Sequence, residues 1–130
     1  MDLNAISILG LASRKMDWLS ERQKTISSNI ANANTPGFKS RDLAAFDDMV
    51  TQAAHVGPVK THGKHLSGSA VSRFAMATDH QGWEERLDGN NVVLEQQTLM
   101  ANETFEKFTL ASQVYRKSAD LLTMAVVGNR

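Results

Sequence analysis

Apolar residues recur with a seven-residue spacing in two long segments, one toward each end of the chain. In the first segment both heptad core positions are mostly apolar over about four heptads, which is typical of a helix that packs along another helix. The second segment repeats this pattern, although one of its stripes is small and partly polar. We therefore predict core helices within residues 1–34 and 91–130. The positions expected to pack between helices are Leu9, Met16, Leu19, Ile26, Leu94, Ala101, Phe108, Tyr115 and Leu122.

Local signals predict where these helices end. Asn91 follows a turn-forming Asp-Gly-Asn sequence and is the expected N-cap of the second helix, whereas Gly128 is its expected stop. At the end of the first helix, Asn34 is expected to take the left-handed conformation that closes many helices. The following Pro36-Gly37 pair favours a type II turn with a positive φ at Gly37.

The central segment, residues 35–90, contains most of the glycines and both prolines and shows little regular periodicity. A short helix is predicted over residues 42–50, with Leu43, Phe46 and Val50 on one side, and a short hairpin is expected around residues 66–78. The predicted fold class is mainly α. Its two long terminal helices pair as a coiled-coil hairpin and are joined by an extended, partly irregular segment.

The lengths of the two predicted helices bear on function. At 1.5 Å per residue they would measure about 48 Å and 55 Å. A compact chain of 130 residues has a radius of gyration of only about 14 Å, so neither rod fits inside one. A hairpin of two such helices leaves much of both apolar faces uncovered. The sequence therefore predicts a subunit that completes its core by assembling with other chains.

Composition excludes several other kinds of function. The chain has no cysteine, which rules out disulfides, thiolate metal sites and cysteine nucleophiles, and its zero net charge argues against general nucleic-acid binding. The four histidines, His55, His62, His65 and His80, form only a weak metal-like pattern, and exposed loop histidines are the simpler interpretation. We expect no catalytic residue, metal or cofactor. No apolar run reaches the roughly 20 residues of a membrane span.

The most informative stretch is rich in asparagine, a poor helix former. One interpretation is a simple helix stop. In the other, Asn29 and Asn32 share one face of the last helical turns, where amides of neighbouring identical subunits could pair without charge repulsion. Both interpretations stay open from the residues alone. The stretch reads Ser28-Asn29-Ile30-Ala31-Asn32-Ala33-Asn34-Thr35-Pro36-Gly37-Phe38-Lys39.

This stretch resembles the N-terminal signature of the bacterial flagellar rod and hook proteins, and the rest of the chain is similar to a proximal rod protein of that family. The resemblance implies a structural subunit, not an enzyme, that polymerises helically at the rod base, transmits torque and forms the wall of the export channel. It assigns an assembly motif made of Asn29, Ile30, Asn32, Ala33, Asn34, Thr35, Pro36, Gly37 and Phe38.

The same resemblance implies the surroundings of the chain. Expected partners are further copies of itself, other proximal rod proteins, the rod-base adaptor FliE, the MS-ring protein and the flagellar type III export apparatus, with no nucleic acid. The expected location is the basal body, reached without a cleaved signal peptide, because Asp2 precedes the apolar start and Arg14-Lys15 follows it. The alternatives are the sister proximal rod protein FlgC, a cytoplasmic coiled-coil adaptor or chaperone, and, least favoured, a metal hydrolase using His62.

Overall fold

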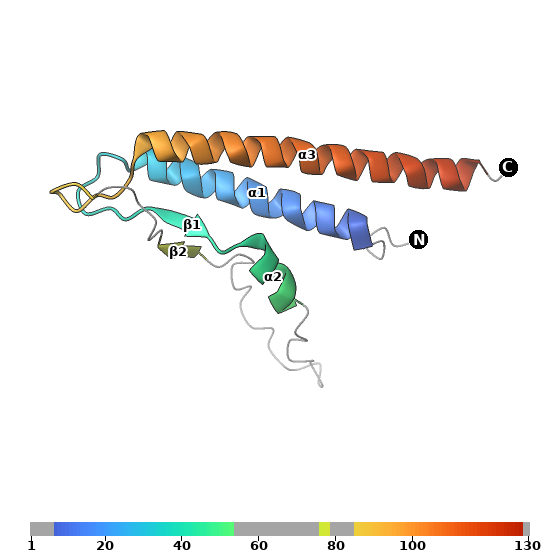
Figure 1. The fold of residues 1–130 in the computed structure, drawn as a ribbon, viewed down its shortest axis with the longest axis horizontal. Coiled ribbons are helices and arrows are strands. Elements are labelled where there is room, and N and C mark those ends of the chain that lie inside the picture. Colours follow the sequence, from blue (N-terminus) through green and yellow to red (C-terminus); the bar gives the residue numbers. More distant parts are fainter. Residues whose placement is uncertain (1–6, 54–75, 79–84, 129–130) are drawn as a thin grey trace, which may run out of the picture.

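Two long antiparallel helices form the body of the molecule (Figure 1). A computed structural model describes residues 7–53, 76–78 and 85–128. Helix α1 spans Ser7–Ala31 and helix α3 spans Leu94–Val127, and their extensive contact confirms the predicted mainly α hairpin. Between them in the chain lie strand β1 (Arg41–Leu43), helix α2 (Phe46–Ala53) and strand β2 (Met76–Thr78).

In the contact between α1 and α3, the large buried apolar side chains come from α1, whereas the buried side chains of α3 are polar. Leu19 and Ile26 of α1 are fully buried, whereas the buried positions of α3 are Gln96, Gln97 and Thr104. Short or amide side chains on α3 leave room for the larger residues of α1. The bulky apolar residues of α3 are therefore displaced to its flanks, where no other described element covers them.

The residues predicted to pack between helices divide into three groups in the single chain. Leu9, Leu19 and Ile26 are buried, whereas Leu94 and Phe108 are exposed at 42% and 39%. Met16, Ala101, Tyr115 and Leu122 are half-buried. For the exposed and half-buried residues, packing in an assembled state stays a prediction.

Beside α1, the segment after the signature stretch forms a small second layer. Trp18 donates a hydrogen bond from Nε1 to the carbonyl of Ala44 at 3.0 Å, and its ring meets that of Phe46 edge-on, with centroids 6.0 Å apart. Together with Leu19 and Leu43 these rings form the main hydrophobic cluster. This cluster fixes β1 and α2 against the middle of α1.

The predicted elements of the central segment are partly correct. The short helix exists but begins at Phe46, because residues 41–43 instead extend as β1. Strand β2 pairs antiparallel with β1, Asp42 opposite Ala77. The local hairpin predicted around residues 66–78 is therefore wrong for residues 76–78, whose partner lies far upstream, and its remaining residues lie outside the described ranges.

The helix ends also differ from the prediction. Helix α1 ends at Ala31, and Asn34 is not left-handed, since no described residue other than glycine has a positive φ. Helix α3 starts at Leu94 with Val93 as its N-cap, because the side chain of Asn91 instead accepts a hydrogen bond from the Ser40 amide. The predicted stop at Gly128 is confirmed, and this residue caps the helix at a right-handed φ of −70°.

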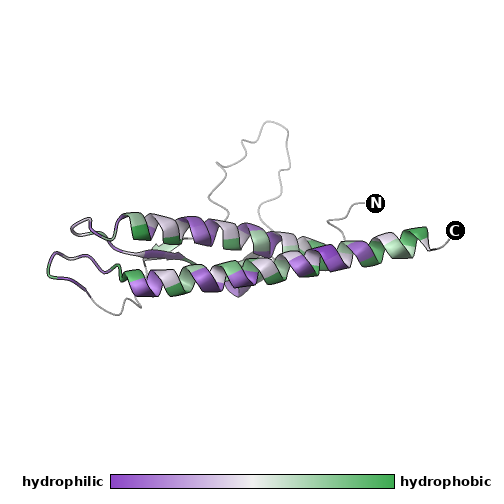
Figure 2. Cartoon of the chain, turned by 90° about the horizontal axis from the view of Figure 1, so that it is seen from above, coloured by the Kyte–Doolittle hydropathy of each residue, from purple (hydrophilic) through white to green (hydrophobic). Residues whose placement is uncertain are grey.

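Colouring by hydropathy shows green apolar patches along both long helices and a mostly apolar C-terminal end of α3 (Figure 2). Helix α3 has 34 residues against 25 for α1, a difference of about 13 Å in length. In the described part of the chain, neither long helix combines the length and apolar character that a membrane crossing requires.

We expect helix stability in the isolated chain to decline away from the end where α1 meets residues 85–97. Buried residues are concentrated at that end and toward the middle, and long helices depend on tertiary contacts for stability. Amide exchange should show the strongest protection near residues 25–30 and 96–104. Uniformly strong protection along the whole of α1 and α3 in a proven monomer would contradict this expectation.

Candidate assembly site

The signature stretch folds against the residues that lead into α3, and we call residues 29–43 together with residues 85–97 the junction. At its centre, Asn90 is completely buried. Its Nδ2 donates to the carbonyls of Asn32 at 3.0 Å, Ala33 at 3.0 Å and Thr35 at 2.8 Å, and its Oδ1 accepts from the Val92 amide at 2.7 Å. These three carbonyls belong to the residues that follow the end of α1 at Ala31. Asn90 therefore fixes the chain that leaves the helix, although it lies far away in the sequence.

Two glycine turns lie against each other in the junction. Gly37 and Gly89 have φ values of 71° and 81°, and a hydrogen bond of 3.2 Å from the Phe38 amide to the Thr35 carbonyl closes the first turn. This geometry confirms the positive φ predicted for the Pro36-Gly37 turn. The Gly37 amide donates to the Asp88 carbonyl at 2.9 Å, so the backbones of the two turns are joined directly.

The buried amide of Asn29 completes the junction from inside α1. Its Nδ2 donates to the Arg41 carbonyl at 2.7 Å and to Oε1 of Gln97 at 3.0 Å, and its Oδ1 accepts from the Arg41 amide at 3.1 Å. Asn32 uses its own amide locally, donating to the Ser28 carbonyl at 2.8 Å. Pairing of Asn29 with its equivalent on another subunit is therefore wrong, because its hydrogen-bonding groups are already used within the chain.

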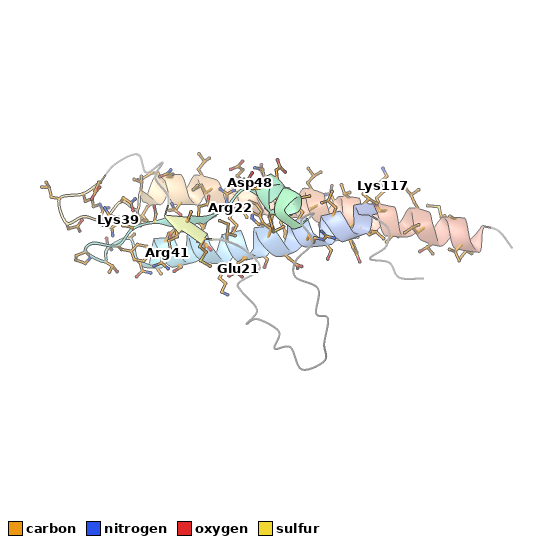
Figure 3. All side chains as sticks on the ribbon, turned by 90° about the horizontal axis from the view of Figure 1, so that it is seen from below. Glu21, Arg22, Lys39, Arg41, Asp48 and Lys117 are labelled. Atoms are coloured by element: carbon orange, nitrogen blue, oxygen red, sulfur yellow. The ribbon has the colours of Figure 1, made fainter. Side chains whose placement is uncertain are left out.

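An ion pair holds β1, the last part of the first segment of the junction, against α1. The Arg22 guanidinium binds the Asp42 carboxylate at two positions, with distances of 2.9 Å from Nε and 2.7 Å from Nη2. The side chains of Arg22 and Asp42 are 13% and 22% exposed, so this pair is largely shielded from water. Such a pair is stronger than an ion pair at a fully exposed surface. Figure 3 shows Arg22 beside β1, with Lys39 farther toward the turn, where it pairs with Glu85.

The predicted assembly motif separates into an inward and an outward part. Asn29 and Ala33 are buried, and Asn32 and Phe38 are half-buried. The outward part, exposed in the single chain, consists of Ile30, Asn34, Thr35, Pro36 and Gly37. The first group shapes the junction, and the second group is the part that is most accessible to another chain.

Sequence reasoning did not identify the roles of Asn90, Gln97 and the Arg22–Asp42 pair. The sequence places Asn90 only in a turn, and Gln97 only among the members of the small, partly polar stripe of the second helix. A usable signal was present in Gln97, since a polar residue at a core position of a heptad pattern often marks a specific buried contact. The contacts of Asn90 with Asn32, Ala33 and Thr35 join residues more than fifty positions apart, so they produce no periodic pattern in the sequence.

Two apolar grooves flank the contact between α1 and α3. The Phe105 groove, of about 420 Å³, has Leu19, Gln23, Thr104, Phe105 and Phe108 among its lining residues. The Lys15 groove, of about 460 Å³, is lined by residues that include Ile8, Leu11, Lys15, Lys107, Leu110 and Val114. Exposed apolar surface of this extent typically marks an interaction surface.

Substitutions in the Pro36-Gly37 turn should rank by backbone strain. A Cβ at position 37 meets no atom within 4 Å, so the cost arises from the positive φ alone. We expect Gly37→Val to destabilise the junction by about 1–3 kcal/mol, Gly37→Ala by less, and Pro36→Ala least. Urea unfolding and swimming on soft agar provide the measurements. Gly37→Asn is the matched control because asparagine tolerates this conformation; equal effects of Gly37→Val and Gly37→Asn would contradict the strain argument.

Comparison with known proteins yields a consistent set of relatives. Residues 14–39 match the family model described as flagella basal body rod protein. The flagellar basal body rod protein FlgB of Agrobacterium fabrum strain C58 is 31% identical over 130 residues, covering 95% of this chain and 96% of the relative. FlgB of Aeromonas hydrophila is 30% identical over 84% of this chain and 79% of its own, and FlgB of Aquifex aeolicus is 30% identical over 80% and 85%.

Proposed function

Because the chain belongs to the family of the flagellar basal body rod protein FlgB and is a structural subunit of that rod, we propose that it polymerises helically at the rod base. In this position its terminal helices would form the wall of the export channel and transmit torque along the rod. The observation that supports the proposal most is the exposed apolar surface of α3. Phe105, Leu110 and Leu121 are 69%, 62% and 58% exposed in the single chain.

Burial of those side chains supplies a driving force for assembly. Removing apolar surface from water contributes roughly 25 cal/mol per Å², so several such residues per subunit provide a substantial gain on contact with neighbours. The junction supports the same role in a different way. It holds α1 and α3 at one end through buried hydrogen bonds, and so presents both grooves on one preformed unit.

The proposed partners are other copies of the chain, the other proximal rod proteins, the rod-base adaptor FliE and the MS-ring protein. Delivery is proposed through the flagellar type III export apparatus. The FlgB relatives support this position over that of the sister protein FlgC. A direct contact between this chain and FliE would distinguish the FlgB position from the FlgC position, because the subunit nearest the rod base is expected to contact FliE.

The proposed role is structural and uses no cofactor. Among the described residues, no three histidine, cysteine, aspartate or glutamate side chains are grouped as a metal site would require. His55, His62, His65 and His80, which formed the weak metal-like pattern, lie outside the described ranges. The proposal therefore rests on the helices and their surfaces.

The test of the proposed function is the location of the chain. A strain deleted for its gene and complemented with an epitope-tagged copy should recover swimming, and the tag should co-purify with isolated basal bodies. Without the chain, the rod should be absent. A tagged chain that restores swimming but remains in the cytoplasmic fraction would contradict the proposal and support the adaptor or chaperone interpretation.

A further inference from the structure

The C-terminal turns of α3 extend beyond the described part of α1. Ile8, the second residue of α1, and Val114 of α3 both line the Lys15 groove. Residues 120–127 therefore continue past the first described turn of α1, as Figure 1 shows, and we call them the overhang. Its apolar residues are prominently exposed, with Leu121 at 58%, Met124 at 61% and Val127 at 64%.

One face of the overhang combines apolar side chains with a single acid. Asp120, Met124 and Val127 are spaced by four and three residues, so they share a helix face, and Leu121 adjoins it. The last turn of α3 contains no basic residue. The negative end of the helix dipole is therefore not balanced by a side chain of that turn.

The Lys15 groove has the complementary character. Its walls are apolar, and its ionised residues are the cations Lys15 and Lys107 and the anion Asp47. The Lys15 ammonium lies 4.1 Å from the centre of the Phe46 ring and 4.7 Å from that of Trp18. Burial lowers the pKa of Lys15, and the negative charge of the nearby Asp47 only partly opposes this shift. Lys107 already pairs with Glu103 of its own helix, so Lys15 is the better partner for an incoming carboxylate.

We propose that the overhang of one subunit docks in the Lys15 groove of a second copy of this chain, with the two copies parallel and head to tail. Leu121, Met124 and Val127 would cover Leu11, Leu110 and Val114, and Asp120 would approach Lys15. The overhang centres on residue 124 and the groove on residue 111 of α3, so the copies are offset by about 20 Å along the helix axis. This inference rests on the proposed function and specifies one of its contacts.

A head-to-tail contact has a different consequence from a reciprocal one. Each copy uses its overhang in one direction and its groove in the other, so the contact can repeat from copy to copy. Because parallel copies are also displaced along the helix axis, the contact does not close into a ring and generates an open row of subunits. A reciprocal arrangement of two antiparallel copies would satisfy both surfaces at once and stop at a dimer. The two arrangements can be separated by counting the chains that are linked together.

Because the chain lacks cysteine, introduced thiols report this contact without interference from its own residues. We expect the double variant Leu11→Cys/Met124→Cys, oxidised in isolated basal bodies, to give a ladder of disulfide-linked multimers. The matched control is Asp17→Cys/Met124→Cys. Asp17 is also exposed on α1, but it points about 120° away from Leu11 around the helix axis. This control should remain largely monomeric.

Each contrary result has a definite meaning. A single dimer band from Leu11→Cys/Met124→Cys would overturn the head-to-tail arrangement, and monomers within basal bodies would overturn the contact altogether. A stronger ladder from the Asp17 variant would place the overhang on another face and would also overturn it. Absence of the unmutated chain from basal bodies would contradict the rod proposal itself, which distinguishes the two failures.

A pair of charge variants tests the contact without thiols. Asp120→Lys should reduce swimming or basal-body incorporation about two- to fivefold, as loss of a partly exposed ion pair predicts. Adding Lys15→Glu to Asp120→Lys should recover part of that loss, whereas adding Asp17→Lys should not. Equal behaviour of the two double variants would overturn the proposed pairing of Asp120 with Lys15.

Discussion

Replacing Asn90 by aspartate should unfold the junction and abolish rod assembly. The substitution keeps the side-chain volume but exchanges the amide donor, which serves three carbonyls of the chain that follows α1, for a carboxylate oxygen that repels them. A buried charge without a partner costs about 3–5 kcal/mol, which is comparable with the whole stability of a small domain. We expect Asn90→Asp to remove amide-exchange protection at residues 25–30 and 96–104 and to abolish swimming.

The matched control is Asn102→Asp, which makes the same chemical change at an exposed position of α3. Surface substitutions of this kind change stability by no more than about 0.5 kcal/mol. A variant Asn90→Asp with protection equal to that of the control would show that the Asn90 hydrogen bonds do not support the junction.

Replacing Ile30 by aspartate should affect assembly far more than the folding of the chain. Ile30 is 40% exposed beside the buried residue Asn29, and it belongs to the outward part of the assembly motif. In a dry contact between subunits an unpaired carboxylate costs several kcal/mol, whereas at the surface of the single chain it costs little. We expect Ile30→Asp to be exported and to fold nearly normally, yet to be missing from basal bodies. Leu122→Asp, at a half-buried position, should have the same outcome.

Ser28→Asp serves as the control for Ile30→Asp. It adds the same charge near the same end of α1, at another exposed position, and so shares the small penalty that an acid incurs at a helix C-terminus. Retained assembly in Ser28→Asp and lost assembly in Ile30→Asp would assign the effect to the contact at Ile30. Normal swimming in both variants would place the subunit interface elsewhere.

The overall fold was accessible from sequence because it depends on periodic patterns. The heptad spacing of Leu19 and Ile26 predicted the buried face of α1 correctly, and the helix stop at Gly128 followed from local propensity. Helix starts were harder to predict. Asn91 has the chemistry of an N-cap, but the Ser40 amide takes its side-chain oxygen, and a tertiary contact of this kind is invisible to local rules.

The candidate site was only partly predictable for the same reason. The positive φ of Gly37 follows from the Pro-Gly pair alone, and it was predicted correctly. The role of Asn29 was not, because its partners Arg41 and Gln97 are supplied by a strand and by the other long helix. The asparagine-rich signature stretch therefore combines residues that bind within the junction with residues that form an exposed surface.

The central claim is that α3 completes the burial of its apolar side chains only in the assembled rod. Phe105 tests it directly, since it is 69% exposed in the single chain and lines one of the two grooves. The decisive measurement is the rate of maleimide labelling of Phe105→Cys, compared between the purified chain and intact basal bodies. We predict rapid labelling of the purified chain and at least about tenfold slower labelling in basal bodies, a change that a burial of about 1.4 kcal/mol already produces. Equal labelling rates in the two states, with the variant present in the basal bodies, would contradict the claim.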